Sequence, residues 1–122
     1  MVIFDTNAIL RYILQDNPAM VAEVKQQLSS KDCFIPVEVV AEMVYVLSKV
    51  YNVERDVIAK TITDITHVSN IKVAQKNVVI HALSVYAHTT LDFVDCLLIG
   101  YEKEEKYTVF TFDKKLRIFL NE

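Results

Sequence analysis

Four acidic residues stand at positions that the packing of a hydrophobic core does not explain. Two of them each follow a short run of apolar and β-branched residues, 2–4 and 107–112, which predicts a carboxylate at the carboxyl end of a strand. In open α/β sheets, ligands bind at that edge. If the first and last strands are neighbours, Asp5, Asp95 and Asp113 meet at one point. The four residues are Asp5, Glu42, Asp95 and Asp113.

Each of these acids also has a structural interpretation. Asp5 suits a helix N-cap, and Asp113 opens a turn sequence. Glu42 lies at the edge of an apolar helical face, where a glutamate can reach water. Asp95 is harder to explain, because Leu91, Leu98 and Ile99 lie near it at helical spacing. Its structural alternative is a charge in the first turn of a helix, where the helix dipole favours it, although Asp92 suits that interpretation better. A carboxylate in such a stripe needs a partner, hydrogen bonds or a metal ion.

The chemistry that fits these side chains is metal-assisted. Carboxylates at contact distance cannot all stay ionised without a cation, and a site made only of oxygen ligands selects Mg²⁺ or Mn²⁺. Such an ion lowers the pKa of a bound water and neutralises charge on a phosphodiester. The chain has one glycine, which excludes a glycine-rich phosphate loop. His81 and His88 are spaced by two helical turns and do not form a zinc pair.

Strands and helices alternate along the chain, which predicts an α/β fold with a mostly parallel sheet. Residues 1–122 form a single domain on this interpretation. The run at residues 2–4 is expected to be a central strand covered on both faces. Strands are predicted at 2–4, 33–35, 71–74 and 107–112, and helices after Asn7 and at 18–28, 37–50, 54–67, 75–87 and 91–104.

The composition bears on the partners of the protein and on its location in the cell. The chain is 52% hydrophobic, so part of its surface is expected to be buried against a second subunit or a partner. A net charge of −3 neither indicates nor excludes nucleic acid. Cys33 and Cys96 are not spaced as a pair and are expected to be buried and reduced. With no recognisable signal peptide and no apolar stretch long enough to span a membrane, we expect a cytoplasmic protein.

Over nearly its whole length the chain resembles the PIN-domain ribonucleases, and within them the VapC-type toxins of prokaryotic toxin–antitoxin pairs. The order and spacing of four stretches carry the resemblance. They are residues 2–11 (VIFDTNAILR), 35–36 (IP) with 40–43 (VAEM), 91–97 (LDFVDCL) and 111–116 (TFDKKL).

The resemblance implies a three-layer α/β/α sandwich and Mg²⁺- or Mn²⁺-dependent endoribonuclease activity. It also implies a homodimer and inhibition by a cognate antitoxin whose peptide fills the active-site groove. The family pattern assigns the metal site to the four acids named above, with Asp5 as the central ligand. Asn7 and Thr111 match positions that orient the carboxylates, and Asp92 matches a secondary acid. Whether one or two ions bind stays open.

Basic residues near these stretches are candidates for holding the RNA backbone, because phosphate contacts supply most nucleic-acid affinity. Arg11 is the foremost candidate, since it lies one helical turn beyond Asn7. Each lysine can equally be a solvated surface charge. The candidates are Arg11, Lys49, Lys114, Lys115 and Arg117.

Two phosphoryl-transfer classes of similar size fit the sequence less well. A haloacid-dehalogenase-type phosphatase needs an aspartate where this chain has Asn7, and a response-regulator receiver needs one at the end of the strand at 71–74. Both phosphoryl-transfer interpretations are therefore disfavoured. A non-enzymatic interaction module that keeps the acids remains an alternative.

Overall fold

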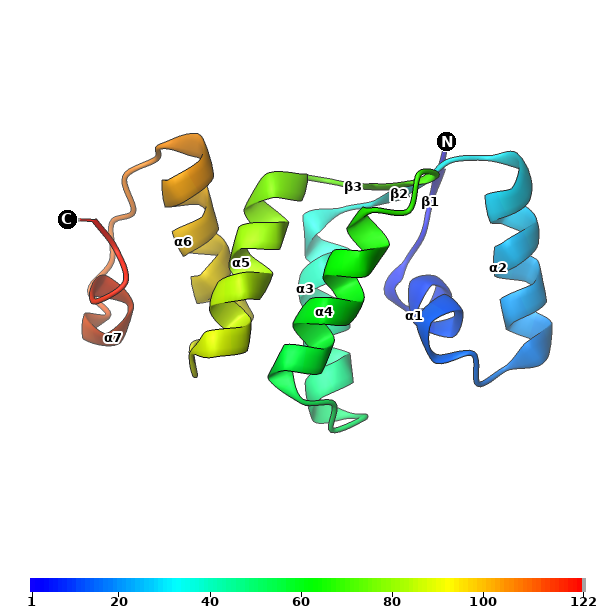
Figure 1. Cartoon of the computed structure of the whole chain (residues 1–122), viewed down its shortest axis with the longest axis horizontal. Helices are drawn as coiled ribbons and strands as arrows, with labels where there is room; N and C mark the ends of the chain where they lie inside the picture. The colour runs from blue at the N-terminus through cyan, green and yellow to red at the C-terminus, as the bar shows by residue number, and fades with distance from the viewer. Residues whose placement is uncertain (122) are drawn as a thin grey trace.

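The computed structural model describes residues 1–121, in which three short strands alternate with seven helices (Figure 1). Most elements lie within a few residues of their predicted bounds. In chain order they are β1 (Val2–Ile3), α1 (Thr6–Leu14), α2 (Pro18–Ser30), β2 (Cys33–Ile35), α3 (Val37–Lys49), α4 (Arg55–Thr66), β3 (Ile71–Val73), α5 (Lys76–His88), α6 (Phe93–Glu105) and α7 (Lys114–Arg117).

The three strands form one parallel sheet in the order β1-β2-β3, flanked by helices. Val2 is in register with Cys33, which is in turn in register with Ile71 on β3. The central strand β2 is the most buried, since Cys33 and Ile35 are both inaccessible to solvent. The α/β class with a parallel sheet, predicted from the alternation of apolar patterns, is confirmed.

Local signals explain where several elements begin. The side chain of Asn17 accepts a hydrogen bond from the N–H of Met20 at 3.1 Å, and Pro18 occupies the first turn of α2. Pro36 ends β2 and precedes α3. These contacts involve only neighbouring residues, so the amino-acid types alone predict them.

Helices α4, α5 and α6 form a tightly packed group on the β3 side. The single glycine, Gly100 on α6, lies so close to α5 that a Cβ atom there would be 2.7 Å from the carbonyl oxygen of Val78. Arg55 on α4 donates hydrogen bonds to the carbonyl oxygens of Tyr86 and Leu91, and its guanidinium lies 3.6 Å from the centre of the Tyr86 ring. These contacts fix the start of α6.

Both cysteines are buried thiols, as predicted. Burial raises the pKa of Cys33 and of Cys96 to about 11, so both are protonated near neutral pH.

The predicted fourth strand at residues 107–112 is wrong, since the described chain has three strands and this segment is not one of them. The segment runs beside α6 at the far end of the molecule from β1 (Figure 1). Phe110 and Phe112 are each 83% exposed. The preference of aromatic and β-branched residues for strands comes from packing against neighbouring strands. Within residues 1–121 this segment has no neighbouring strand.

The expectation that residues 2–4 form a central strand is also wrong, because no strand of the described chain pairs with the other side of β1. β1 lies at the edge of the sheet, and Ile3 is 66% exposed. The first and last predicted strands are therefore not neighbours in one copy of the chain.

Within residues 1–121, no helix has the length and apolarity needed to cross a membrane.

Candidate functional site

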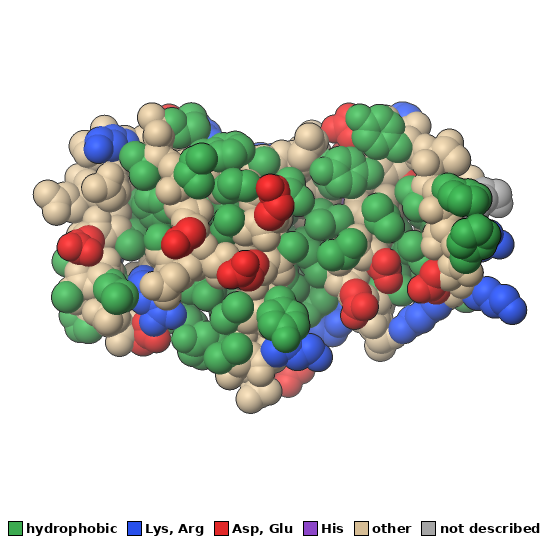
Figure 2. Space-filling model, turned by 180° about the vertical axis from the view of Figure 1, so that it is seen from behind, with side chains coloured by type: hydrophobic (Ala, Val, Ile, Leu, Met, Phe, Trp, Pro, Cys, Tyr) green, Lys and Arg blue, Asp and Glu red, His purple; other side chains and the backbone are tan. Residues whose placement is uncertain are grey.

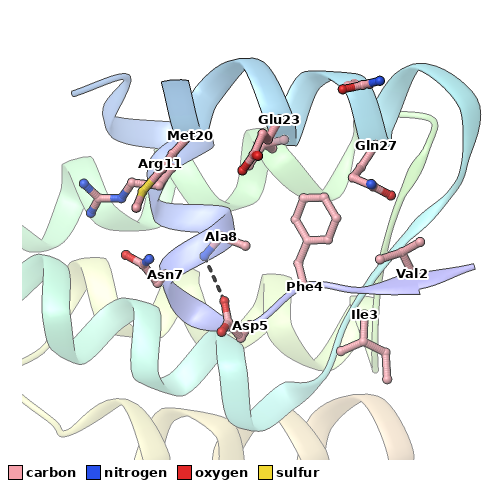
Figure 3. Close-up of a pocket in the computed structure, with 12 residues that line it drawn as sticks. Val2, Ile3, Phe4, Asp5, Asn7, Ala8, Arg11, Met20, Glu23 and Gln27 are labelled. Atoms are coloured by element: carbon pink, nitrogen blue, oxygen red, sulfur yellow. Dashed lines mark hydrogen bonds between the residues drawn. The ribbon is translucent and has the colours of Figure 1, made fainter. Parts of the chain in front are cut away.

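Asp5 lies where β1 gives way to α1. Its Oδ1 atom accepts a hydrogen bond of 2.9 Å from the N–H of Ala8, so it caps α1 (Figure 3). The capping interpretation of Asp5 is thus realised in the structure. The side chain remains exposed, and its Oδ2 atom makes no hydrogen bond to residues 1–121. Asp5 is therefore both held in one orientation and accessible to a ligand.

A cavity of about 540 Å³ opens beside Asp5, between β1, α1 and α2 (Figure 3). Its wall is mixed, with apolar side chains from β1 and α2 and polar ones from α1 and α2. The residues that line it are Val2, Ile3, Phe4, Asp5, Asn7, Ala8, Arg11, Met20, Glu23, Val24, Gln26 and Gln27.

Arg11, the foremost candidate for phosphate binding, already has partners. Its guanidinium forms an ion pair with Asp16 and donates a 3.2 Å hydrogen bond to the hydroxyl of Tyr51. The hydrogen bond with Tyr51 raises the pKa of Arg11, and the negative charge of Asp16 acts in the same direction. Its buried Nε has no hydrogen-bond partner within residues 1–121. Tyr51 is forty residues from Arg11, so no local pattern marks that partner, and Asp16, five residues away, was not predicted as one.

Three further acids lie together near the start of α6. Asp92 is the N-cap residue of α6 without a side-chain hydrogen bond, and Asp95 lies partly buried in the first turn. Asp113 caps α7 by accepting hydrogen bonds from the N–H groups of Lys115 and Leu116, at 2.8 and 3.1 Å. Burial raises the pKa of Asp95, and the charges of Asp113 and Asp92 raise it further.

Polar neighbours hold Asp113 in place. The hydroxyl oxygen of Thr111 accepts a 3.0 Å hydrogen bond from the N–H of Asp113. The guanidinium of Arg117 donates two hydrogen bonds to the carbonyl oxygen of Thr111, and Lys115 donates one to the hydroxyl of Thr90. Lys114 is exposed. Thr111 thus holds the backbone of Asp113, and its role toward the Asp113 carboxylate stays a prediction.

The four acids of the proposed metal site are not gathered in one copy. Glu42 is exposed on α3. Within residues 1–121, no three His, Cys, Asp or Glu side chains are placed to hold one ion. Figure 2 shows acidic side chains at separate places on one face, with hydrophobic side chains between them. The donor types suit Mg²⁺ or Mn²⁺, but their placement in a single copy does not.

This placement corrects the expectation that Asp5, Asp95 and Asp113 meet at one point. That expectation required residues 107–112 to lie beside β1, and in the structure they do not. Asp95 lies on α6 and Asp113 at the start of α7, whereas Asp5 lies between β1 and α1, next to the sheet (Figure 1).

The raised pKa of Asp95 gives a testable prediction. The folded protein holds this proton more tightly than the unfolded chain does, so ionising Asp95 lowers stability as the pH rises through its folded pKa. Asp95→Asn is therefore expected to raise the urea midpoint of the metal-free protein at pH 7. The gain should vanish as the pH falls below the ordinary aspartate pKa of about 3.9.

The matched variant is Asp113→Asn, which keeps a side-chain acceptor for the cap of α7 and removes one charge near Asp95. In that background the gain from Asp95→Asn should shrink. An equal gain at pH 3 and pH 7 would show instead that packing, and not charge, limits stability at this position.

Comparison with known proteins adds one finding. A family model described as PIN domain matches residues 2–119. The search of curated proteins and the search of solved structures found no match.

Proposed function

The chain belongs to the PIN-domain family, whose members are generally nucleases, and on that basis we propose that it is a metal-dependent endoribonuclease. The observation that carries the proposal is the extent of the family match, residues 2–119, which includes all four candidate acids. The metal site is assigned to Asp5, Glu42, Asp95 and Asp113.

In this proposal Mg²⁺ or Mn²⁺, when bound, supplies an activated water and offsets charge on the scissile phosphodiester. The chain supplies orientation. The cap hydrogen bond from Ala8 holds Asp5, and the contact with Thr111 holds Asp113. Asn7 lines the cavity next to Asp5, and we propose that it helps to orient the Asp5 carboxylate and that Asp92, near Asp95, is a secondary acid.

RNA is the proposed substrate, and basic side chains at both ends of the molecule would contact its phosphates. Lys114 and Lys115 directly follow Asp113, and Arg11 lines the cavity beside Asp5. Because Arg11 is paired with Asp16, its contact with a phosphate requires an exchange of partners.

The biological setting that we propose is a cytoplasmic toxin of the VapC type, working as a homodimer and held inactive by a cognate antitoxin. The cavity beside Asp5 has both apolar and charged walls, which suits an inhibitory peptide that carries an apolar anchor and a basic side chain. Exposed large hydrophobic residues such as Phe110 and Phe112 support a protein partner or a second subunit.

Metal removal tests the activity. Purified protein is expected to cleave a mixed RNA pool with Mg²⁺ or Mn²⁺ and to stop with EDTA, and excess Mn²⁺ should restore cleavage. Single-stranded DNA of matched sequence serves as the comparison substrate. Equal cleavage in EDTA would overturn metal dependence, and preferential cleavage of DNA would overturn the choice of RNA.

A non-enzymatic interaction module is the second candidate, and the separation of the acids in one copy favours it. Titration with Mn²⁺, followed by calorimetry, distinguishes the two. The nuclease binds the ion in a way that depends on Asp5, whereas an interaction module has no need of a carboxylate-dependent ion site.

A further inference from the structure

A second cavity, of about 310 Å³, opens between α3 and the start of α6, and it shares no residue with the cavity beside Asp5. Its volume lies at the lower end of the range of about 300–1,000 Å³ for small-molecule pockets, so it suits one flat ring system rather than an extended ligand. Six of the residues that line it carry the argument below. They are Tyr45, Lys49, Arg55, Tyr86, Asp92 and Phe93.

The inner wall of this cavity is aromatic and is held in place by contacts between three helices. Tyr86 and Phe93 are buried and meet edge to face, with their ring centroids 5.8 Å apart. Arg55 donates hydrogen bonds to the carbonyl oxygens of Tyr86 and Leu91, and its guanidinium lies over the Tyr86 ring. Because these contacts join α4, α5 and α6, the wall is preorganised for a ligand.

Three other lining residues carry groups that the fold does not use. The ring of Tyr45 is 63% exposed, although it is a large aromatic side chain. Asp92 is the N-cap residue of α6, yet its side chain makes no capping hydrogen bond. Lys49 is exposed and forms no ion pair within residues 1–121. An aromatic ring, a carboxylate and an ammonium group are thus available to a ligand.

A nucleobase matches this combination of groups. A base has two apolar faces, on which aromatic side chains stack, and a polar edge, to which charged side chains hydrogen-bond. An apolar side chain of a peptide does not match, because it would bury the charges of Asp92 and Lys49 without giving them a partner. The cavity therefore has the chemistry of a base-binding site.

We propose that this cavity binds a guanine base of the RNA substrate. A carboxylate only accepts hydrogen bonds, so Asp92 selects a base whose edge donates them. Guanine places two donors side by side, its N1–H and its N2 amino group, and these match the two oxygens of one carboxylate. Adenine and cytosine place a ring acceptor beside their amino group, and uracil has one N–H between two carbonyl oxygens. Lys49 donates to the O6 atom of guanine.

The position of the cavity connects base recognition with cleavage, and this connection rests on the proposed function. Asp92 is three residues before Asp95 in the chain, and its negative charge acts on Asp95. A base held at Asp92 brings its own ribose and phosphate toward the acids of α6. The substrate is thereby narrowed from RNA in general to RNA with a guanosine next to the cleaved bond.

Binding in EDTA tests the base preference without any need for activity. The probes are short, fluorescently labelled oligouridylates with one central guanosine, inosine, adenosine, cytidine or uridine, and fluorescence anisotropy gives the dissociation constants. We expect the guanosine probe to bind at least about tenfold more tightly than the uridine probe, because bidentate contacts discriminate between bases by about this factor or more. Inosine lacks the N2 amino group of guanosine, so its affinity should fall between the two.

Four variants assign the preference to the cavity. Tyr45→Ala removes the exposed ring and is expected to weaken binding of the guanosine probe by at least about fivefold, whereas Tyr45→Phe keeps the ring and the affinity. Asp92→Asn keeps a good N-cap residue but replaces one acceptor by a donor, so the preference for guanosine should be lost. Tyr107→Ala removes a tyrosine of similar exposure, 60%, outside the cavity and should leave binding unchanged.

The outcomes separate this inference from the proposed function. Equal affinity for all probes overturns the guanine site and leaves the nuclease function intact. A guanosine preference that survives in both Tyr45→Ala and Asp92→Asn overturns it in the same way. Binding of none of the probes overturns the site and also counts against RNA as the substrate. With Mn²⁺, the wild type should cut a mixed RNA pool mainly beside guanosines, and cuts spread evenly over the four bases would overturn the placement of the site next to the cleaved bond.

Discussion

Asp5→Asn is expected to lower RNA cleavage by at least about 100-fold, because a bound metal ion contributes several kcal/mol and each 1.36 kcal/mol is a factor of ten in rate. The substitution keeps the shape of the side chain and removes its charge. Asparagine is as good an N-cap as aspartate, so the hydrogen bond from Ala8 is retained and α1 stays in place. Initial rates of RNA cleavage with Mn²⁺, together with urea unfolding, provide the measurement.

Two variants make the result specific. Asp32→Asn removes the same charge from an exposed position between α2 and β2 and should leave cleavage unchanged. Asp5→Ala removes both the charge and the cap, so it should lose activity and also about 1 kcal/mol of stability. Cleavage by Asp5→Asn at a rate near that of the wild type would exclude Asp5 as the central ligand.

Gly100→Ala is expected to have the largest effect on stability. Alanine in an exposed helix is better than glycine by up to about 1 kcal/mol. At Gly100 the added Cβ would lie 2.7 Å from the carbonyl oxygen of Val78 and 3.1 Å from its Cγ1. A backbone oxygen cannot rotate away as a side chain can, so α5 and α6 must separate. We expect a loss of about 1–3 kcal/mol in the free energy of unfolding, measured with urea.

The matched control is Ser84→Ala, an alanine substitution at an exposed position on α5, which should change stability by less than about 0.5 kcal/mol. The double variant Gly100→Ala/Val78→Ala removes the Cγ1 contact but leaves the carbonyl oxygen, so it should remain destabilised. Wild-type stability of Gly100→Ala would mean that α5 and α6 separate without cost.

Much of the fold was predictable because its signals are local. The apolar spacing of α3, the cap and proline at the start of α2, and the buried run of β2 each depend on residues within a few positions of one another. The capping of α1 by Asp5 was predictable on the same grounds. Capping hydrogen bonds and apolar periodicity of this kind depend only on residues close in the sequence, so distant parts of the chain do not change them.

The candidate site was predictable only in its chemistry. The residue types indicate oxygen ligands and a divalent ion, and the family match agrees with nuclease-type activity. The partners of Arg11, however, are Asp16 and Tyr51, and the group that fixes the start of α6 is Arg55. Tyr51 and Arg55 lie 31 to 40 residues from the groups that they contact, and no local pattern marks those contacts.

The α/β class, the positions of the helices and the acidic character of the candidate site follow from the residue types and their short-range spacing, so they could be predicted without the structure. Two features became visible only in the folded chain: residues 107–112 do not pair with β1, and Asp5 does not lie with Asp95 and Asp113. The physical reason is that a strand is stabilised by its neighbour. Whether a strand-like segment becomes a strand depends on whether it reaches a free edge, and residues 107–112 do not lie in the sheet of the described chain.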